Sequence, residues 1–392
     1  MNAHTAYDLQ QMQSLPLEAK ISMTKQRIKA WYESWSRFEI VNEKTGKSRF
    51  ITMDTRDNFA EPKIQKNEWI RSVIPGAVCV SFSGGKDSTV LKHIVDSMYS
   101  DVPSVFVNTG LEYPEIQHFV REIKNGKYEC FNSDIDIVRP KMKFHEVLKK
   151  YGYPVISKRV ANAVDGANRN PDGVKMKQML GIWETNGKLS MFNYGQHKKL
   201  LDADFKISDK CCDVMKKKPL KMYHKEKACV PIIATMAHES ERRRINWIKN
   251  GCNAFESENP SSQPLSFWTE QDILQYIKKY DVPYCPVYGD IVIDESADDV
   301  LEGQLNIFDE IGDYETAGKL KTTGCDRTGC IFCMFGCHLE KEPNRFQRLK
   351  ETHPRQYDYC INGGEMVDGK WQPNKEGLGL GKVLDYIGVP YE

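Results

Sequence analysis

The chain has 392 residues, of which 40% are hydrophobic and 28% charged, and its net charge is +1 at neutral pH. These values predict an ordinary globular protein with a sizeable core, and they exclude a general electrostatic attraction to nucleic acid or membranes. No run approaches the roughly 20 apolar residues of a membrane span, and the N-terminal residues lack an apolar core of signal-peptide length. We therefore expect a cytoplasmic protein without a membrane partner.

Residues 1–75 are expected to form a helical lead-in that has no chemical signature. Apolar residues fall near one helical stripe, at Ile21, Ile28, Trp31, Trp35 and Phe38. Such a stripe is typical of a helix that packs on a core or contacts another subunit.

The next segment, SFSGGKDS, joins a predicted strand at residues 77–80 to a predicted helix whose apolar stripe begins at Val90. Gly84 and Gly85 let backbone N–H groups approach an anion closely, and the start of a helix favours negative charge. The spacing matches neither a Walker A loop nor a dinucleotide fingerprint. We predict that residues 83–88 form a phosphate-binding loop.

The side chains of this loop support the same prediction. They are Ser83, Lys86, Asp87 and Ser88. The two hydroxyls are donors and Lys86 is a mobile cation, whereas Asp87 suits an anion site only if a cation such as Mg²⁺ accompanies the phosphates. We assign Lys86 and Asp87 as the catalytic candidates.

Further strands follow the loop helix. Residues 105–107 read as a buried strand ending in the turn Asn108-Thr109-Gly110, Pro114 opens another helix, and residues 135–138 form a candidate third strand. This alternation predicts a doubly wound, mostly parallel, Rossmann-like α/β sheet, in which ligands lie beyond the carboxyl ends of the strands. The Asn108–Gly110 turn is therefore expected to face the same crevice as the phosphate loop.

The segment VPIIATMAHES is another strand-to-loop transition, and Glu239, Ser240 and Arg243 follow it as candidate nucleotide ligands. Lys158 and Arg159 fit either phosphate contacts or a solvated helix face. Thr269, with Asp272 three residues later, is expected to cap a structural helix. The predicted domains are the lead-in at 1–75, a nucleotide-binding domain at 76–285, an acidic insertion or linker at 286–323 and a cysteine-rich region at 324–392.

Cysteines cluster in two places. In a reducing compartment, clustered cysteines are more often ligands than disulfides. The clusters are Cys211-Cys212, which lies among lysines, and Cys325, Cys330, Cys333 and Cys337. The residues alone leave three alternatives open: a [4Fe–4S] cluster, a structural Zn²⁺ held by Cys325, Cys330, Cys333 and either Cys337 or His338, and no metal.

Six segments occur in the order found in the phosphoadenosine phosphosulfate (PAPS) reductase family, and they span about residues 78–340. They are SGGKDS, VNTGLEYPE, KCCDVMKKKPL, MAHESERR, PLSFWTEQDILQYI and GCIFC. SGGKDS resembles the PP-loop of the ATP pyrophosphatase superfamily, which implies binding of ATP or an adenosine sulfonucleotide. The resemblance also implies that Cys211, Cys212, Cys330 and Cys333 ligate a [4Fe–4S] cluster, while Cys325 or Cys337 could replace one of the first pair.

The chain departs from the family pattern at several positions. Asn108 stands where the family usually has aspartate, and Met236 stands where it has a substrate-binding arginine. Reductases of the family carry a nucleophilic cysteine in a short tail, whereas the last cysteine here is Cys360. These departures weaken the expectation of a reductase.

Three functions follow from this reading. The first is ATP-dependent adenylyl activation with sulfur transfer, which would need a nucleic-acid or other acceptor and a partner protein that supplies sulfur. The second is a PAPS or adenylyl-sulfate reductase that releases sulfite, with Cys360 or another thiol as nucleophile. The third is a non-enzymatic, nucleic-acid-associated or regulatory protein, suggested by the basic stretches 216–227 and 241–244.

Overall fold

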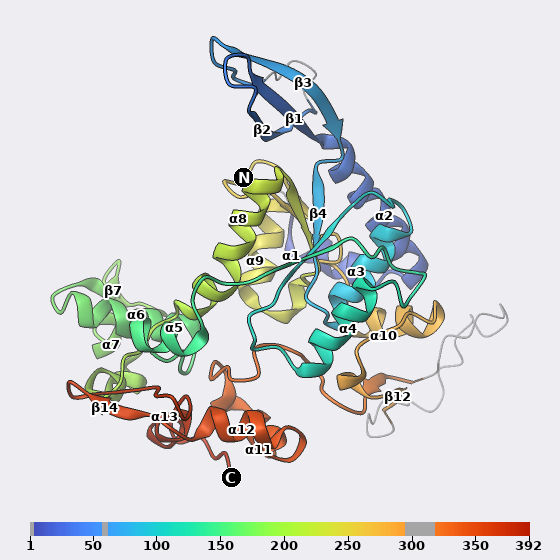
Figure 1. Cartoon of the computed structure of the whole chain (residues 1–392). Coiled ribbons are helices and arrows are strands. Elements are labelled where there is room, and N and C mark those ends of the chain that lie inside the picture. Colours follow the sequence, from blue (N-terminus) through green and yellow to red (C-terminus); the bar gives the residue numbers. More distant parts are fainter. Residues whose placement is uncertain (1–3, 57–61, 295–317) are drawn as a thin grey trace. The chain divides into compact units, whose positions relative to one another are not determined.

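The computed structural model describes residues 4–56, 62–294 and 318–392, and its helices and strands are drawn in Figure 1. The chain divides into two compact units, each built from stretches that are distant in sequence. Unit 1 comprises residues 1–106, 113–138 and 222–328, and unit 2 comprises residues 107–112, 139–221 and 329–392. The sequence instead predicts four consecutive segments. Most of the predicted acidic insertion, residues 295–317, lies outside the described residues.

A six-stranded, mostly parallel sheet lies in unit 1, in the order β10-β11-β9-β4-β5-β6. Its strands are β4 (Val78–Ser81), β5 (Ser104–Val107), β6 (Ile135–Val138), β9 (Val230–Ile233), β10 (Asn253–Ala254) and β11 (Ser261–Ser262). Strand β4 pairs in parallel with β5 and β9, whereas β10 and β11 are antiparallel. The predicted α/β class with a mostly parallel sheet is confirmed.

Unit 1 also contains helices and one small hairpin (Figure 1). They are α1 (Ala6–Gln13), α2 (Leu17–Ser34), α3 (Lys86–Asp96), α4 (Pro114–Lys124), α8 (Lys218–Lys227, which begins in unit 2), α9 (Glu241–Asn250), α10 (Glu270–Lys279), and the hairpin of β12 (Ile291–Ile293) and β13 (Leu320–Thr322). The predicted stripe of α3 is fully buried from Val90 to Val95. Thr269 caps α10 and forms a capping box with Asp272, as predicted. Lys20 of α2 forms a buried ion pair with Asp272, with 2.8 Å between Nζ and Oδ1.

The N-terminal lead-in is only partly helical, which corrects the prediction. Helix α2 ends at Ser34, and a three-stranded antiparallel sheet follows in the order β2-β1-β3. Its strands are β1 (Trp35–Asn42), β2 (Ser48–Asp54) and β3 (Glu68–Pro75). Phe38, expected on the helical stripe, lies in β1 opposite Ile51 and Val73. Its conformation therefore depends on cross-strand partners more than ten residues away in the sequence. The local spacing of apolar residues, from which the helical stripe was predicted, carries no information about such partners.

Unit 2 is built from short helices and hairpins. They are α5 (Phe144–Tyr151), α6 (Lys158–Arg169), α7 (Val174–Leu180), β7 (Glu184–Thr185), β8 (Lys188–Leu189), α11 (Arg345–Thr352), α12 (Pro354–Ile361), β14 (Glu365–Val367), β15 (Lys370–Gln372) and α13 (Leu380–Ile387). Single bridges join its distant stretches, at Tyr153 with Ile207 and at Phe205 with Trp371. Within the described parts of both units, no helix combines the length and the hydropathy that a bilayer span requires.

Candidate functional site

The phosphate loop, residues 83–88, connects β4 to α3 in unit 1. Gly84 has a φ of +73°, and a Cβ atom there would lie 2.9 Å from the Ile116 Cγ2 atom of α4. Gly85 is the N-cap of α3, and a Cβ atom there would lie 3.1 Å from both the Tyr288 hydroxyl and Thr328 Oγ1. A side chain at position 84 would therefore be strained, whereas at position 85 the two hydroxyls would have to shift by a few tenths of an ångström. The N–H groups at the start of α3 have no partner within the helix, which suits an anion.

The two loop serines hold the shape of the turn. The Oγ atoms of Ser83 and Ser88 lie 2.9 Å apart, and the Ser83 N–H donates to Ser88 Oγ at 3.2 Å. Ser88 Oγ in turn donates to the Gly85 carbonyl oxygen at 2.9 Å. Ser88 is buried and Ser83 is exposed, so Ser83 is the hydroxyl of this pair that a ligand reaches directly.

Lys86 is 4% exposed, and its ammonium group is held in place on two sides. Lys86 Nζ lies 2.5 Å from the Asp326 carbonyl oxygen and 3.0 Å from a carboxylate oxygen of Glu270. Its backbone N–H donates to the Tyr288 hydroxyl at 3.1 Å, and that hydroxyl also lies 2.6 Å from Thr328 Oγ1. The cation is therefore positioned beside the loop before any ligand arrives.

Asp87 is the unusual member of the loop. The residue is half-buried as a whole, but its Oδ1 atom is shielded from solvent and has no hydrogen-bond partner in the described part of the chain. Burial raises the pKa of this carboxyl group, and the nearby Lys86 opposes the rise. A shielded carboxylate oxygen without a partner is the kind of ligand that Mg²⁺ takes together with phosphate oxygens. The residues present therefore fit the predicted Mg²⁺.

Two arginines of unit 1 converge on a single carboxylate. Glu239 forms ion pairs with Arg243 of α9 and with Arg327, and its Oε2 accepts a hydrogen bond from the Met236 N–H at 3.0 Å. Burial lowers the pKa of Arg243, and the neighbouring Arg327 lowers it further. Both arginines also act electrostatically on Asp87. The two guanidinium groups can exchange Glu239 for a phosphate, because both anions accept paired N–H donors.

The remaining predicted nucleotide ligands have other roles in the structure. The Ser240 side chain caps α9 by accepting from the Arg243 N–H. Asn108, Thr109 and Gly110 belong to unit 2, where the Thr109 hydroxyl donates to Glu112 at 2.6 Å. Their approach to the phosphate loop stays a prediction. Met236 is 3% exposed and packs in the core.

Sequence reasoning missed several residues of this site. Tyr288 and Thr328 support the loop from positions more than 200 residues away, and Arg327 supplies a second guanidinium. Arg327 stands between two cysteines of the second cluster and could have been noticed there. Tyr288 has no local signal that would have identified it.

The second candidate site lies in unit 2, which contains Cys211, Cys212, Cys330 and Cys333. A π-helical turn, Asp213–Lys217, follows the Cys-Cys pair, and such turns often occur at functional sites. The Sγ atoms of the adjacent pair lie 4.0 Å apart. Cys330 and Cys333 form a turn in which the Cys333 N–H donates to the Cys330 carbonyl oxygen at 3.0 Å.

These four thiols act on one another and on nearby cations. A hydrogen bond with Cys211 lowers the pKa of Cys212 to about 6, and Lys158 and Lys216 act in the same direction. Burial raises the pKa of Cys330 to about 11 and also raises that of Cys333. Burial alone would lower the pKa of Lys216, but Cys330 and Glu112 raise it above its usual value.

Cys325 and Cys337 are the two alternative cysteine ligands. Cys325 belongs to unit 1. Cys337 is 1% exposed, and its Sγ donates to the Met334 carbonyl oxygen at 3.0 Å. Burial raises the pKa of Cys337 to about 11 and Cys333 acts in the same direction, so Cys337 is electrostatically linked to the four family positions.

The thiols of this site can be compared with what a metal centre needs. Over the residues that the structure describes, no group of three or more His, Cys, Asp or Glu side chains is arranged to hold one metal ion. One buried and three half-buried thiols beside Lys158, Lys216 and Arg345 nevertheless fit a ligand set for a multi-atom iron–sulfur cluster.

The family of the chain follows from comparison with known proteins. Residues 77–170 and 174–333 match the family model described as "Phosphoadenosine phosphosulfate reductase domain". The chain belongs to this family. The match includes the phosphate loop and all four predicted cluster cysteines, and it confirms the family predicted from the sequence motifs.

Three proteins illustrate how similar this PAPS reductase family member is to its relatives. A phosphoadenosine 5'-phosphosulfate reductase of Alkalilimnicola ehrlichii is 21% identical over 57% of this chain and 70% of its own length. An adenosine 5'-phosphosulfate reductase of Staphylococcus haemolyticus is 22% identical over 60% of this chain and 74% of its own length. An uncharacterized protein of Methanocaldococcus jannaschii is 37% identical over 22% of this chain and 20% of its own length.

Among solved structures, a phosphoadenylyl-sulfate reductase from Candida auris in a phosphate complex is similar, with 16% identity and a TM-score of 0.30. The similarity covers 53% of this chain and 75% of that chain.

Proposed function

We propose that unit 1 binds Mg²⁺-ATP at the phosphate loop and transfers the adenylyl group to an acceptor hydroxyl. The acceptor oxygen would attack the α-phosphorus, the bond from that phosphorus to the oxygen bridging to the β-phosphate would break, and pyrophosphate would leave while the hydroxyl loses its proton. Lys86 would neutralise the phosphate chain, and Arg243 and Arg327 would exchange Glu239 for phosphate oxygens. A partner protein would then supply hydrosulfide, whose sulfur would attack the carbon that carries the adenylylated oxygen, and the bond between that carbon and that oxygen would break as AMP leaves.

The observation that supports ATP over an adenosine sulfonucleotide is the shielded Asp87 Oδ1 atom in the loop, which has no hydrogen-bond partner among the described residues. A carboxylate without a partner would repel a bare anion, whereas a Mg²⁺ ion on the phosphates would give it one. Cys211, Cys212, Cys330 and Cys333 would hold a [4Fe–4S] cluster. When bound, this cluster would hold or pass the sulfur atom.

Isothermal titration calorimetry, which measures the affinity for ATP with and without Mg²⁺, tests the proposed nucleotide site. We expect ATP to bind with Mg²⁺ and to lose most of its affinity in EDTA, and Lys86→Ala to bind weakly under both conditions. Asp87→Asn should bind Mg²⁺-ATP more weakly, and Asp134→Asn is its matched control, because Asp134 is an exposed residue of unit 1 outside the loop. Equal ATP affinity with and without Mg²⁺ would contradict the proposed role of Asp87. Pyrophosphate release on adding candidate nucleic-acid or small acceptors then tests the reaction.

A second function, sulfonucleotide reduction, is supported by the names of the two reductases above. In that reaction a thiolate would attack the sulfur of the sulfonucleotide, the bond from that sulfur to the phosphate oxygen would break and release the nucleotide, and thioredoxin would reduce the resulting thiosulfonate to sulfite. Cys360 does not suit the nucleophile, since it is 0% exposed and burial raises its pKa well above the usual value. Sulfite release from either sulfonucleotide with thioredoxin, together with binding that needs no Mg²⁺, would favour this function over adenylyl transfer.

A further inference from the structure

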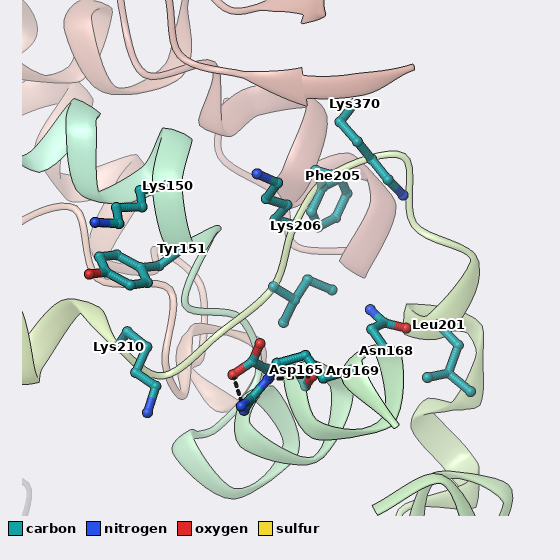
Figure 2. Close-up of a pocket in the computed structure, with 11 residues that line it drawn as sticks. Lys150, Tyr151, Asp165, Asn168, Arg169, Leu201, Phe205, Lys206, Lys210 and Lys370 are labelled. Carbon is teal, nitrogen blue, oxygen red and sulfur yellow. Dashed lines mark hydrogen bonds and ion pairs between the residues drawn. The ribbon is translucent and has the colours of Figure 1, made fainter. Parts of the chain in front are cut away.

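A cavity lies in unit 2, and apart from Lys210 its lining residues lie outside the six family segments. It has a volume of about 560 Å³, and its lining comes from α5, α6, the segment 201–210 and the β14–β15 hairpin. Figure 2 shows Lys150 and Tyr151 on one side of it and Lys206, Phe205 and Lys370 on another. A cavity of this size suits a ligand of small-molecule or nucleotide dimensions.

The charge of the lining is strongly one-sided. Five of its side chains are cationic and one is a carboxylate, and this carboxylate, Asp165, is already paired with Arg169 at 2.8 Å (Figure 2). Within the described ranges, none of the four lining lysines forms an ion pair with a carboxylate. A lysine of the same unit outside the cavity, Lys382, does pair with Asp204. The cavity therefore presents positive charge that an anion would neutralise.

The lysines have partial restraints that keep them at the cavity. Lys370 Nζ donates to the Ala203 carbonyl oxygen at 2.8 Å, and Lys206 Nζ lies 3.5 Å from the Lys149 carbonyl oxygen. Carbonyl oxygens hold an ammonium group without cancelling its charge, so its remaining N–H donors are left for a ligand. Restraint of this kind lowers the entropy lost when an anion binds.

The lining is also apolar and aromatic. Phe205 is 3% exposed and is fixed by edge-to-face contacts with Tyr153 and Tyr386, so it forms a rigid wall. Tyr151 is half-buried, and Lys150 Nζ lies 5.3 Å from the centre of its ring. A half-exposed aromatic ring beside several lysines is the combination that binds a nucleobase together with its phosphate.

We infer that this cavity binds a nucleoside phosphate, with the base against the Tyr151 side and the phosphate among Lys150, Lys206, Lys210 and Lys370. The same chemistry is offered by a free nucleotide and by one residue of an unpaired DNA or RNA strand. The inference is independent of the proposed ATP site, because the cavity shares no residue with the phosphate loop or with the four cluster cysteines.

Fluorescence anisotropy with the full chain tests the inference. The probe is a labelled ten-residue oligothymidylate, and the competitors are uridine monophosphate, pyrophosphate, hexaglutamate and a DNA duplex. Pyrimidine probes are used because they limit binding at the proposed ATP site, which takes adenine. Lys86→Ala in the phosphate loop should therefore leave the affinity for the pyrimidine probes unchanged. The test variant is Lys206→Glu/Lys370→Glu, and its matched control is Lys341→Glu/Lys375→Glu, which reverses two exposed lysines of unit 2 outside the cavity.

We expect the test variant to weaken oligothymidylate binding at least tenfold and to flatten its salt dependence, while the control changes affinity less than about threefold. Tyr151→Ala should weaken uridine monophosphate about fivefold or more and leave pyrophosphate unchanged. Far stronger binding of the strand than of uridine monophosphate identifies a nucleic-acid strand as the source, and similar affinities identify a free nucleotide.

Other outcomes overturn the inference. Equal losses in the test and control variants would show unspecific charge attraction. Competition by hexaglutamate or the duplex as strong as that of uridine monophosphate would exclude a nucleoside phosphate. Lys206→Gln/Lys370→Gln, with a thermal unfolding curve for every variant, repeats the test without introducing new negative charge.

Discussion

Replacing Asp87 by asparagine should stabilise the protein while it impairs Mg²⁺-ATP binding. The Asp87 Oδ1 atom is shielded from solvent and unpartnered among the described residues. A buried polar group without a partner costs about 1–3 kcal/mol, and a charged one costs more. Asparagine keeps the shape but removes the charge, so we expect the free energy of unfolding to rise by about 1–2 kcal/mol at neutral pH.

The stability difference between Asp87→Asn and the wild type should depend on pH. Burial raises the pKa of Asp87 in the folded protein above the ordinary value of 3.8. At pH values between 3.8 and the raised pKa, the folded state binds more protons at Asp87 than the unfolded state does. The Asp87 carboxyl group therefore destabilises the wild type more as the pH rises through the raised pKa. The difference between Asp87→Asn and the wild type should therefore be largest at neutral pH and close as pH falls towards 3.8.

Urea unfolding followed by tryptophan fluorescence measures this difference, because five of the seven tryptophans lie in unit 1 with the loop. The exposed control Asp134→Asn should stay within about 0.5 kcal/mol of the wild type. The reasoning fails if Asp87→Asn is less stable at neutral pH, or if the difference does not narrow between pH 7 and pH 4. Unchanged Mg²⁺-ATP affinity in this variant would separately refute the metal-binding role.

Three further predictions test other parts of the structure. Lys20→Met leaves the Asp272 carboxylate buried without its ion-pair partner and should lower the free energy of unfolding by about 3–5 kcal/mol. The double variant Lys20→Met/Asp272→Asn should recover part of this loss. A loss below about 1 kcal/mol in urea unfolding would contradict the prediction. Tyr288→Phe removes the hydroxyl that accepts from the phosphate loop and should weaken ATP about two- to tenfold by calorimetry, so an unchanged affinity would mean that the contact does not matter. Cys333→Ala should lose iron and sulfide after anaerobic purification, whereas Cys360→Ala, in a fully buried position, should keep both; full iron content in Cys333→Ala would exclude it as a ligand.

The sequence by itself determined the local parts of this protein. The strand, the glycine turn and the start of α3 follow from rules that act within a few residues: alternation of apolar side chains, glycine at a positive φ, and an apolar helical stripe. The same holds for Pro114 at the start of α4 and for the Thr269 capping box. Motif order was enough to identify the family, because each motif is a short run of neighbouring residues.

The tertiary structure decided which distant residues complete each site. Tyr288 reaches the phosphate loop across 202 residues of sequence, Arg327 joins Arg243 on Glu239, and Cys325 falls in a different unit from Cys330. The tertiary structure also places Met236 and Cys360 in buried positions. In the sequence, Met236 is a departure from the family pattern and Cys360 is a candidate nucleophile. The physical reason is that burial and cross-strand pairing depend on which segments pack together to remove apolar surface from water, and no local pattern contains that information.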